Sequence, residues 1–416
     1  MTISQSAEQA PSKPPADLRP PALVVRMSAI GDTLIATRTH ALLEERGYAP
    51  YLLTQANNSS LLQCMPLLSG ACLISESDVK FFLRNLQSQS LQEVSQNDFS
   101  AALRHGNEKI AADLRVNKHL KCLHVLDLQN TARSRRAVNT FANCFAADGF
   151  NYRISKVAKN TLWRLLLVLL SFFSRQQLTP RTPPAWLQRR LKPVHALQRA
   201  MIERLPEVPN RRLSAQMSEG NPSVERIAGR VPLIALSPAD WQTQSYVVFV
   251  VGASYRLKSW PRENYRALLA MILENTSLKV VLCGGPEDQD IGHYLAFPAQ
   301  ERVANLIGKT SLAETLGLIK SAVYVVTGDS FASHAADLLG TPVSVIFGAT
   351  HPLLGFAPAG SQATVHHSGL SCSPCSRHGQ GECRFRNIRC LTSIKPEEVF
   401  SKIEQIWRSS RQIANS

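Results

Sequence analysis

AVYVVTGDSFASHAADLLGTPVSVIFGATHPLLGFAP, residues 322–358, is the stretch from which the architecture of this chain can be read. The apolar run 322–326 predicts a buried strand, and the polar turn 327–330 leads into a helical pattern that ends before Gly340. A second apolar run over 343–347 predicts the next strand. A strand, a helix and a strand in this order make a βαβ unit, in which ligands lie at the carboxyl ends of the strands and against helix N-termini.

Three polar residues stand at the entrance of that predicted helix: Asp329, Ser330 and His334. Asp and Ser are good helix caps in their own right, and a single histidine inside a helix is more often packed than functional. Free N–H groups, a hydroxyl and an imidazole together are nevertheless suited to an anion. The turn therefore predicts a diphosphate site, with simple capping as the alternative.

The chain begins with the same kind of unit. Residues 22–27 predict a buried strand, and a turn containing Gly31 leads into a predicted helix over 33–46. This turn does not have the GxGxxG pattern of dinucleotide-binding domains. Asp32 either caps the helix or faces a cleft as a general base, and the loop alone leaves both interpretations open.

Two further loops follow predicted strands in the second half of the chain. The strand 246–251 leads into GAS at 252–254 and then Lys258, whose ammonium group can neutralise a phosphate or simply be solvated. Another strand leads into GGPE at 284–287. Glu287 either benefits from the positive end of a helix dipole or accepts hydrogen bonds from ribose hydroxyls.

The length of 416 residues is too great for one ordinary core, so two domains are expected. Residues 76–120 are polar and mostly helix-like, and we place the linker in the polar segment 216–232. Two successive doubly wound halves predict an α/β protein with a cleft between two Rossmann-like domains. The predicted parts are a disordered leader over 1–20, an N-terminal domain over 21–220, a C-terminal domain over 221–395, and a helix over 396–416 that packs back on the first domain.

Positive charge is concentrated in one segment. The formal net charge is +15, and residues 151–215 hold 13 Lys and Arg against two acidic residues. Such a surplus favours anionic partners, among them nucleic acid, anionic lipid and phosphorylated substrates. The apolar run 165–173 in this segment is too short to span a membrane. It is either a core or interdomain helix with a solvated basic flank, or an interfacial segment whose cations meet anionic lipid.

Four of the nine cysteines lie close together near the C-terminus, in the order Cys372-x2-Cys375-x7-Cys383-x6-Cys390. The first pair has metal-ligand spacing and the others are looser, so a structural metal and unligated thiols both remain open. Residues 1–20 contain no apolar segment typical of a signal peptide. We therefore expect reduced thiols and a cytoplasmic protein.

Six sequence blocks occur along the chain in the same order as in one known family. They are RMSAIGD at 26–32, DLQNTARS at 127–134, HALQR at 195–199, GASYRLKSWPRENY at 252–265, CGGPED at 283–288 and the long block at 307–352. Together with the C-terminal cysteine pattern, they resemble the heptosyltransferase family, which is glycosyltransferase family 9. This family moves ADP-activated heptose onto the inner core of lipopolysaccharide.

The resemblance implies a GT-B fold, in which the first domain binds the acceptor and the second binds the nucleotide-sugar donor. It implies an inverting transfer that needs no cofactor for catalysis, from ADP-heptose to a phosphorylated acceptor of the lipopolysaccharide core. The implied partners are an ADP-sugar and an anionic glycolipid, with no nucleic acid. The protein would be peripheral on the inner face of the cytoplasmic membrane, which the basic segment 151–215 would contact.

Site residues also follow from the resemblance, position by position. Asp32 would be the general base that deprotonates the acceptor hydroxyl, and Lys258 would stabilise the developing diphosphate charge. The implied donor-binding residues are Ser254, Glu287, Thr327, Asp329, Ser330 and His334. The implied acceptor-binding residues are Ser28, Gly31, Arg133 and Ser134.

Two positions depart from the family pattern, since Phe331 stands where a glycine is usual and Arg38 lies where a proline is usual. Phe331 favours an alternative in which the chain binds a nucleotide or glycolipid without turnover. A glycosyltransferase of the same fold that uses another nucleotide-sugar or a protein acceptor is a further alternative. A nucleic-acid binder is disfavoured, because no interleaved aromatic residues or recognised binding module accompany the charge.

Overall fold

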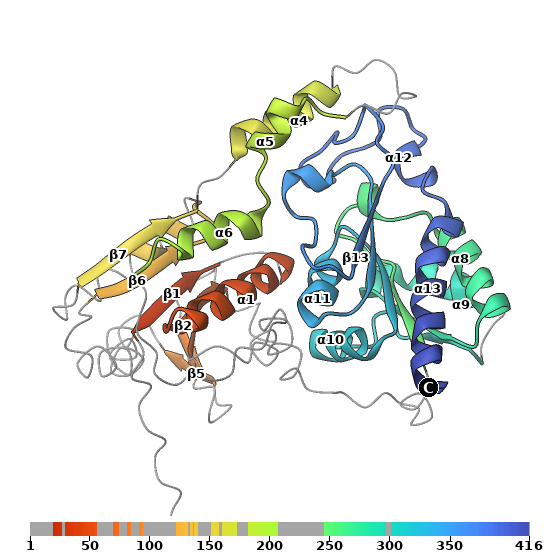
Figure 1. The fold of residues 1–416 in the computed structure, drawn as a ribbon, viewed down its shortest axis with the longest axis horizontal. Helices are drawn as coiled ribbons and strands as arrows, with labels where there is room; N and C mark the ends of the chain where they lie inside the picture. Colours follow the sequence, from red (N-terminus) through yellow and green to blue (C-terminus); the bar gives the residue numbers. More distant parts are fainter. Residues whose placement is uncertain are drawn as a thin grey trace, which may run out of the picture.

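Figure 1 shows the computed structural model of the chain, in which two α/β halves lie side by side. The structure describes residues 20–26, 30–55, 70–74, 81–84, 91–94, 122–131, 134–135, 137–139, 151–157, 160–172, 182–206, 245–296 and 301–415. The predicted leader, apart from Pro20, and the predicted linker at 216–232 therefore lie outside the described residues.

The first half is built on a sheet whose strand order in the described residues is β5-β4-β3-β2-β1-β6-β7. The strands are β1 Pro21–Val25, β2 Ala49–Gln55, β3 Gly70–Ile74, β4 Phe81–Arg84, β5 Leu91–Val94, β6 Cys122–Asp127 and β7 Asn151–Lys156. Neighbouring strands pair in parallel except at one edge, where β4 is antiparallel to both β3 and β5. The helix-like expectation for 76–120 is wrong at β4 and β5, because edge strands tolerate the polar side chains that hid their pattern.

The second half is built on a sheet with the order β10-β9-β8-β11-β12-β13, in which neighbouring strands are parallel. The strands are β8 Tyr246–Val250, β9 Lys279–Cys283, β10 Val303–Asn305, β11 Tyr324–Gly328, β12 Val343–Phe347 and β13 Ala363–His367. Counted from β8, this is the 3-2-1-4-5-6 order of a doubly wound nucleotide-binding sheet. The winding reverses between β8 and β11, so their carboxyl ends flank the crevice where such sheets bind ligands.

The described helices are α1 Ile30–Glu45, α4 Thr161–Phe172, α5 Ala185–Arg190, α6 Val194–Ile202, α8 Arg262–Asn275, α9 Gln289–Ala296, α10 Leu312–Ser321, α11 Phe331–Leu339, α12 Arg389–Thr392 and α13 Pro396–Asn415, with short 3₁₀ turns η3 Arg256–Lys258, η4 Pro286–Asp288 and η5 Pro352–Leu354. Most helices pack beside the two sheets, whereas α4 and α5 lie apart from them at the top of Figure 1. The unit predicted over 322–358 is confirmed as β11, α11 and β12. Gly340 ends α11 with a φ of 75°, the left-handed region that glycine adopts without strain.

The C-terminal helix α13 packs on the second half. Val399 and Ile403 of α13 are fully buried in one cluster with Leu268 and Ile272 of α8. Figure 1 likewise places α13 beside α8. The expectation that residues 396–416 pack back on the first domain is therefore wrong, because the apolar surface of α8 covers the apolar side chains of α13.

The helices α4 and α5 leave the first half and pack on the second. Leu167, Leu187 and Leu191 form a small buried cluster with Leu354, which lies in η5 after β12. The next helix, α6, returns to α1 in the first half. The continuous first domain predicted over 21–220 is thus interrupted by a hairpin that belongs to the second. No helix in the described parts of the chain combines the length and apolarity needed to cross a membrane.

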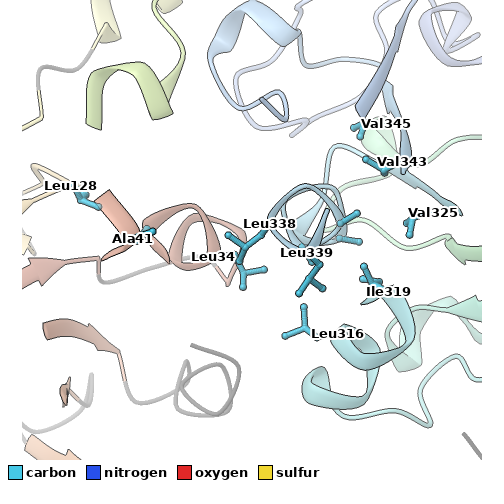
Figure 2. Packing of buried hydrophobic residues seen from close by; sticks show 14 of the residues in the cluster. Leu34, Ala41, Leu128, Leu316, Ile319, Val325, Leu338, Leu339, Val343 and Val345 are labelled. Carbon is cyan, nitrogen blue, oxygen red and sulfur yellow. The ribbon is translucent and has the colours of Figure 1, made fainter. Parts of the chain in front are cut away.

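The helices α1 and α11 lie against each other and join the two halves. Leu34 of α1 and Leu338 of α11 belong to one buried cluster, and Figure 2 shows the two side chains close together. Each helix follows a central strand of its own sheet, β1 or β11. Their contact therefore brings the carboxyl-end loops of the two sheets to the same place.

Candidate active site

A cleft of about 740 Å³ opens where the loops after β8, β9 and β11 face the start of α1. This volume is in the range of small-molecule sites. The predicted site residues that line it are Gly31, Ser254, Lys258, Glu287, Asp329, Ser330 and His334. Lining residues that were not predicted include Gly252, Asp288, Thr310, Phe331, Phe356, Arg377 and His378.

Lys258 is held at this cleft by Asp329. Its Nζ lies 2.9 Å from Asp329 Oδ2, and the Thr350 hydroxyl donates to the same oxygen at 2.8 Å. The side chains of Lys258 and Asp329 are only 17% and 10% exposed. Asp329 therefore orients the ammonium group of Lys258 at the cleft. The donor-binding role expected for Asp329 stays a prediction, and because a carboxylate repels a diphosphate it would act through Lys258.

Gly328 lets the two loops of this ion pair approach each other. A Cβ at Gly328 would lie 2.4 Å from the carbonyl oxygen of Lys258, a distance that no real side chain tolerates. Glycine is therefore required where β11 passes η3.

The entrance of α11 is capped as its sequence predicts. The Ser330 hydroxyl accepts a hydrogen bond from the Ala332 N–H at 3.3 Å and pairs with the Thr327 hydroxyl at 2.9 Å. Ser330 and His334 line the cleft, whereas Thr327 is fully buried outside it. Thr327 therefore supports the cap, which corrects the expectation that it contacts the donor.

The glycine-rich turn after β9 places two carboxylates at the cleft. Asp288 Oδ2 accepts a hydrogen bond from the Gly285 N–H at 2.9 Å, and Glu287 extends from the same turn. Burial raises the pKa of Asp288 and the nearby Glu287 raises it further, against the opposing effect of the Gly285 hydrogen bond. Carboxylates of this kind accept hydrogen bonds from hydroxyls such as those of a ribose. Asp288 is the last residue of the CGGPED block at 283–288, and this block is the sequence feature from which its place at the cleft could have been predicted.

A loop from the cysteine-rich segment adds two basic side chains to the cleft, Arg377 and His378. The loop lies directly on Lys258, since a Cβ at Gly379 would fall 2.4 Å from Lys258 Cγ. The φ of Gly379 is +83°, which also favours glycine there. The sequence gives no helix or strand signal for this loop, so only the fold could bring Arg377 and His378 to the site.

On the opposite wall, Gly31 packs closely against the start of α11. A Cβ at Gly31 would lie 3.2 Å from Cδ2 of His334 and 3.3 Å from Cα of Phe331. Phe331 is partly buried against the cluster that joins α1 and α11, and it also lines the cleft. The residue that replaces the usual family glycine thus forms part of the contact between the two halves.

Asp32 lies in the first turn of α1, which begins at Ile30, and its side chain lies outside what the structure describes. The capping role expected for a helix that begins at Thr33 is wrong, because the helix already includes Asp32. A carboxylate in the first turn remains favourable to the helix dipole. The backbone of the neighbouring Gly31 lines the cleft, so Asp32 is located at its edge.

Of the other residues expected to bind the acceptor, Ser28 and Arg133 lie outside the described residues. Ser134 is fully buried, and its hydroxyl donates to Asp127 Oδ2 at 3.0 Å while accepting from the Thr131 N–H at 2.8 Å. This arrangement stabilises the loop after β6. It corrects the expectation that Ser134 contacts the acceptor directly.

The four C-terminal cysteines line one apolar cavity of about 20 Å³. Burial raises the pKa of Cys372, Cys375 and Cys390, the last to about 12. Burial also acts on Cys383, but backbone N–H groups that donate to its sulfur outweigh it and lower its pKa. Within the described ranges, no three His, Cys, Asp or Glu side chains are placed to hold a metal ion as they stand.

Comparison with known proteins finds a similarity to one family. Residues 181–385 match glycosyltransferase family 9 (heptosyltransferase). A lipooligosaccharide heptosyltransferase 2 of Haemophilus influenzae is 31% identical over 163 residues, which cover 38% of this chain and 46% of that protein. Over this part the chain is similar to glycosyltransferase family 9. Its match spans about half the length of the curated relatives.

Solved structures of this family share the fold over a greater length. The E. coli ADP-heptose lipopolysaccharide heptosyltransferase II superposes with a TM-score of 0.53 at 19% identity, covering 94% of this chain and 99% of that one. An E. coli heptosyltransferase with ADP, WaaC, gives a TM-score of 0.56 at 16% identity, covering 93% and 99%. The chain therefore has the GT-B architecture of two Rossmann-like domains that the sequence predicted.

Proposed function

We propose that this chain is an inverting glycosyltransferase of family 9 that moves heptose from ADP-heptose to a phosphorylated acceptor of the lipopolysaccharide core. The observation that carries the proposal is the Lys258–Asp329 ion pair at the switch point of the second sheet, beside the N-terminus of α11. A fixed cation and a helix N-terminus at one edge of a cleft suit a diphosphate leaving group. The family relationship makes ADP-heptose the preferred donor.

The proposed transfer needs one base and one site for the leaving group. Asp32 takes the proton from the acceptor hydroxyl, and the resulting oxygen forms a bond to C1 of the sugar. The bond from C1 to the diphosphate oxygen breaks on the opposite face, its electron pair leaves with ADP, and the configuration at C1 inverts. Lys258 offsets the charge that develops on the diphosphate. No cofactor takes part in this proposal.

The remaining lining residues divide between the two parts of the donor. Glu287 and Asp288 are proposed to accept hydrogen bonds from the ribose hydroxyls. Arg377, which lies on the same wall as Lys258, is proposed to add positive charge beside the diphosphate. The acceptor would enter from the side of Gly31 and Asp32. It would be an anionic glycolipid at the inner face of the cytoplasmic membrane, in keeping with the basic segment 151–215.

An Asp32→Asn variant tests the mechanism. It should lose transfer, because an amide cannot accept the proton, while isothermal titration should give nearly the wild-type affinity for ADP. Transfer that persists in this variant would remove Asp32 from the mechanism. Equal loss of ADP affinity would mean that Asp32 supports the fold of the cleft instead.

Two alternatives are separated by the choice of ligand. If the chain binds nucleotide without turnover, as Phe331 led us to consider, ADP-heptose will bind to the wild type and no transfer will follow. If it uses another nucleotide-sugar, titration will show tighter binding of UDP than of ADP. If it uses a protein acceptor, mass spectrometry of the surface glycolipid from a strain without this chain will find no missing sugar. A missing heptose in that glycolipid would support the proposed reaction.

A further inference from the structure

The hairpin of α4 and α5 concentrates exposed apolar side chains. Among the described residues, five of the eight large hydrophobic side chains that are exposed belong to it: Leu162 at 70%, Leu165 at 40%, Leu169 at 49%, Phe172 at 60% and Trp186 at 49%. The four on α4 recur at intervals of three or four residues, so they form one stripe along a single helix face. An exposed stripe of this kind marks an interaction surface.

The opposite face of the same hairpin is firmly attached to the second half. Leu167 is 3% exposed and packs in the cluster around Leu354. The guanidinium of Arg164 lies 5.1 Å from the ring centre of Phe356. At the other end of α4, Arg384 donates to the Ser171 carbonyl at 3.0 Å. The outer stripe is therefore displayed on a fixed support, and only at its C-terminal end does another side chain meet it, where Arg384 lies over the ring of Phe172.

The charge around the stripe identifies the partner. Arg189, Arg190 and Lys192 of the hairpin are exposed, and Arg199 on α6 is exposed as well. No acidic residue occurs between 151 and 202, and the wider segment 151–215 carries 13 of the 46 Lys and Arg of the chain. Apolar side chains beside exposed cations, without acids, complement an anionic lipid surface, where the cations meet headgroups and the apolar stripe meets acyl chains.

We infer that α4 lies flat in the interface of an anionic bilayer, with its outer stripe in the acyl boundary and the arginines of α5 at the headgroups. A helix of 12 residues is about 18 Å long, which is too short to span a bilayer and sufficient to lie on one. The inference names the membrane-binding element of the proposed enzyme. The purpose of membrane binding rests on the proposed function, because a glycolipid acceptor lies in a membrane. Binding to the membrane does not itself require turnover.

The geometry also connects the bilayer to the cleft. Phe356 lies under Arg164 of α4 and at the same time lines the cleft. The membrane-binding hairpin is therefore one side chain away from the site where the donor is proposed to bind. A protein held by α4 would keep the cleft close to headgroup sugars, which diffuse only within the plane of the membrane.

Flotation with lipid vesicles tests the inference on the full-length protein. Vesicles of phosphatidylglycerol and phosphatidylethanolamine should carry the wild type, and vesicles of phosphatidylcholine should carry much less. Leu162→Ser with Leu169→Ser should weaken binding to the anionic vesicles about tenfold, because two exposed apolar side chains lose their contact with lipid. Arg189→Gln with Arg190→Gln should weaken binding and reduce its dependence on salt.

Val365→Ser is the matched control, because Val365 is an exposed apolar side chain of β13 at 37%. It should bind vesicles as the wild type does. Transfer to a water-soluble acceptor without acyl chains should be equal in the wild type and in the Leu162→Ser, Leu169→Ser variant. If the proposed enzymatic function is wrong, the transfer assay will show no activity, whereas the flotation result will not change. Absence of wild-type binding, or equal binding by the stripe variant, would overturn the inference. A wild-type dimer that the stripe variant converts to monomer, without vesicle binding, would overturn it in favour of a second copy of the chain.

Discussion

Arg38 and Asp337 form an ion pair that connects the two halves of the molecule, with Arg38 Nη2 at 2.8 Å from Asp337 Oδ2. Asp337 also accepts hydrogen bonds from the N–H groups of Ala359 and Gly360, at 3.0 Å and 2.7 Å. The pair lies about two helical turns from the cleft on both α1 and α11. It therefore fixes how the helix that carries Asp32 is placed against the helix that begins at the proposed diphosphate site.

Replacement of Arg38 by Met should disturb this alignment and leave the donor half intact. The side chain of Asp337 is only 6% exposed, so loss of its cation should lower the free energy of unfolding by about 1–3 kcal/mol. We expect kcat to fall about tenfold while ADP affinity stays within about twofold, because Asp337 keeps its two backbone donors. Arg38→Lys should recover part of kcat.

A second readout separates the effect of Arg38 on charge from its effect on packing. Burial lowers the pKa of His195, and the adjacent Arg38 lowers it further. In Arg38→Met this pKa should rise, as a titration followed by NMR of the His195 ring can measure. Parallel losses of ADP affinity and kcat would contradict the proposed division between the two halves.

Lys258→Met should weaken ADP binding about 10- to 100-fold, because a charge-assisted hydrogen bond to phosphate contributes about 1.5–3 kcal/mol. Asp329→Asn should have a smaller effect on affinity and a larger one on kcat, since Lys258 remains present but is no longer oriented. Calorimetric titration with ADP and a transfer assay measure the two quantities. Lys402→Met is the control, because Lys402 is exposed on α13, away from the cleft. An affinity for ADP that is equal in Lys258→Met and wild type would exclude Lys258 from the diphosphate site.

The architecture was predictable from the sequence where strand, turn and helix signals agree locally. The apolar runs 22–27, 246–251 and 322–326 all became central strands, because buried parallel strands are continuous hydrophobic segments. The errors concern what lies far apart in the chain. The partner of α13 and the attachment of α4 to the second half depend on which apolar surfaces meet in three dimensions, and no local pattern encodes that choice.

The site shows the same division. Lys258, Glu287 and Ser330 stand in the segments that follow strands β8, β9 and β11, so the rule that ligands bind at carboxyl ends found them. That rule could not distinguish a side chain that lines the cleft from one buried beneath it, as with Thr327. Arg377 reaches the cleft from a loop without secondary structure, about 120 residues along the chain from Lys258, and only the folded arrangement reveals it.

The stability of the second half should decrease in mild acid because of two partly buried histidines. The rings of His351 and His367 lie 4.2 Å apart between centroids. Burial lowers the pKa of His351 from 6.5 to about 3, with a further contribution from His367, and lowers that of His367 to about 4. Below about pH 6.5 the unfolded chain therefore binds protons that the folded chain does not. Stability is lost as the pH falls from there toward 4, on the order of 1 kcal/mol per pH unit for each histidine.

Urea unfolding at pH 7.5 and pH 5 measures this loss. His351→Asn should give a smaller difference between the two pH values, because the amide oxygen can still accept the hydrogen bond that His351 Nδ1 accepts from the Leu353 N–H at 2.9 Å but does not titrate. A difference as large as that of the wild type would assign the acid sensitivity to other groups.

The cysteine loop should hold Arg377 over the cleft through the four thiols at its base. Leu257, the neighbour of Lys258, lines the same cavity as the cysteines, so the packing of this cavity reaches the ion pair directly. The donors to the Cys383 sulfur favour its thiolate, and four thiols around a space of about 20 Å³ leave room for one ion. We propose a structural metal there, which would require the thiols to move closer together and lose their protons.

Metal analysis of the chain purified under reducing conditions should then find about one equivalent of zinc or iron. A chelator, or Cys375→Ser, should remove the metal, lower the melting temperature by several degrees and weaken ADP binding, because Arg377 and the loop on Lys258 would lose their support. Cys122→Ser is the control, since that cysteine begins β6 in the other half. A metal-free chain whose melting temperature does not respond to chelator would identify the four cysteines as packed thiols, with Cys375→Ser acting only through the loss of apolar contact.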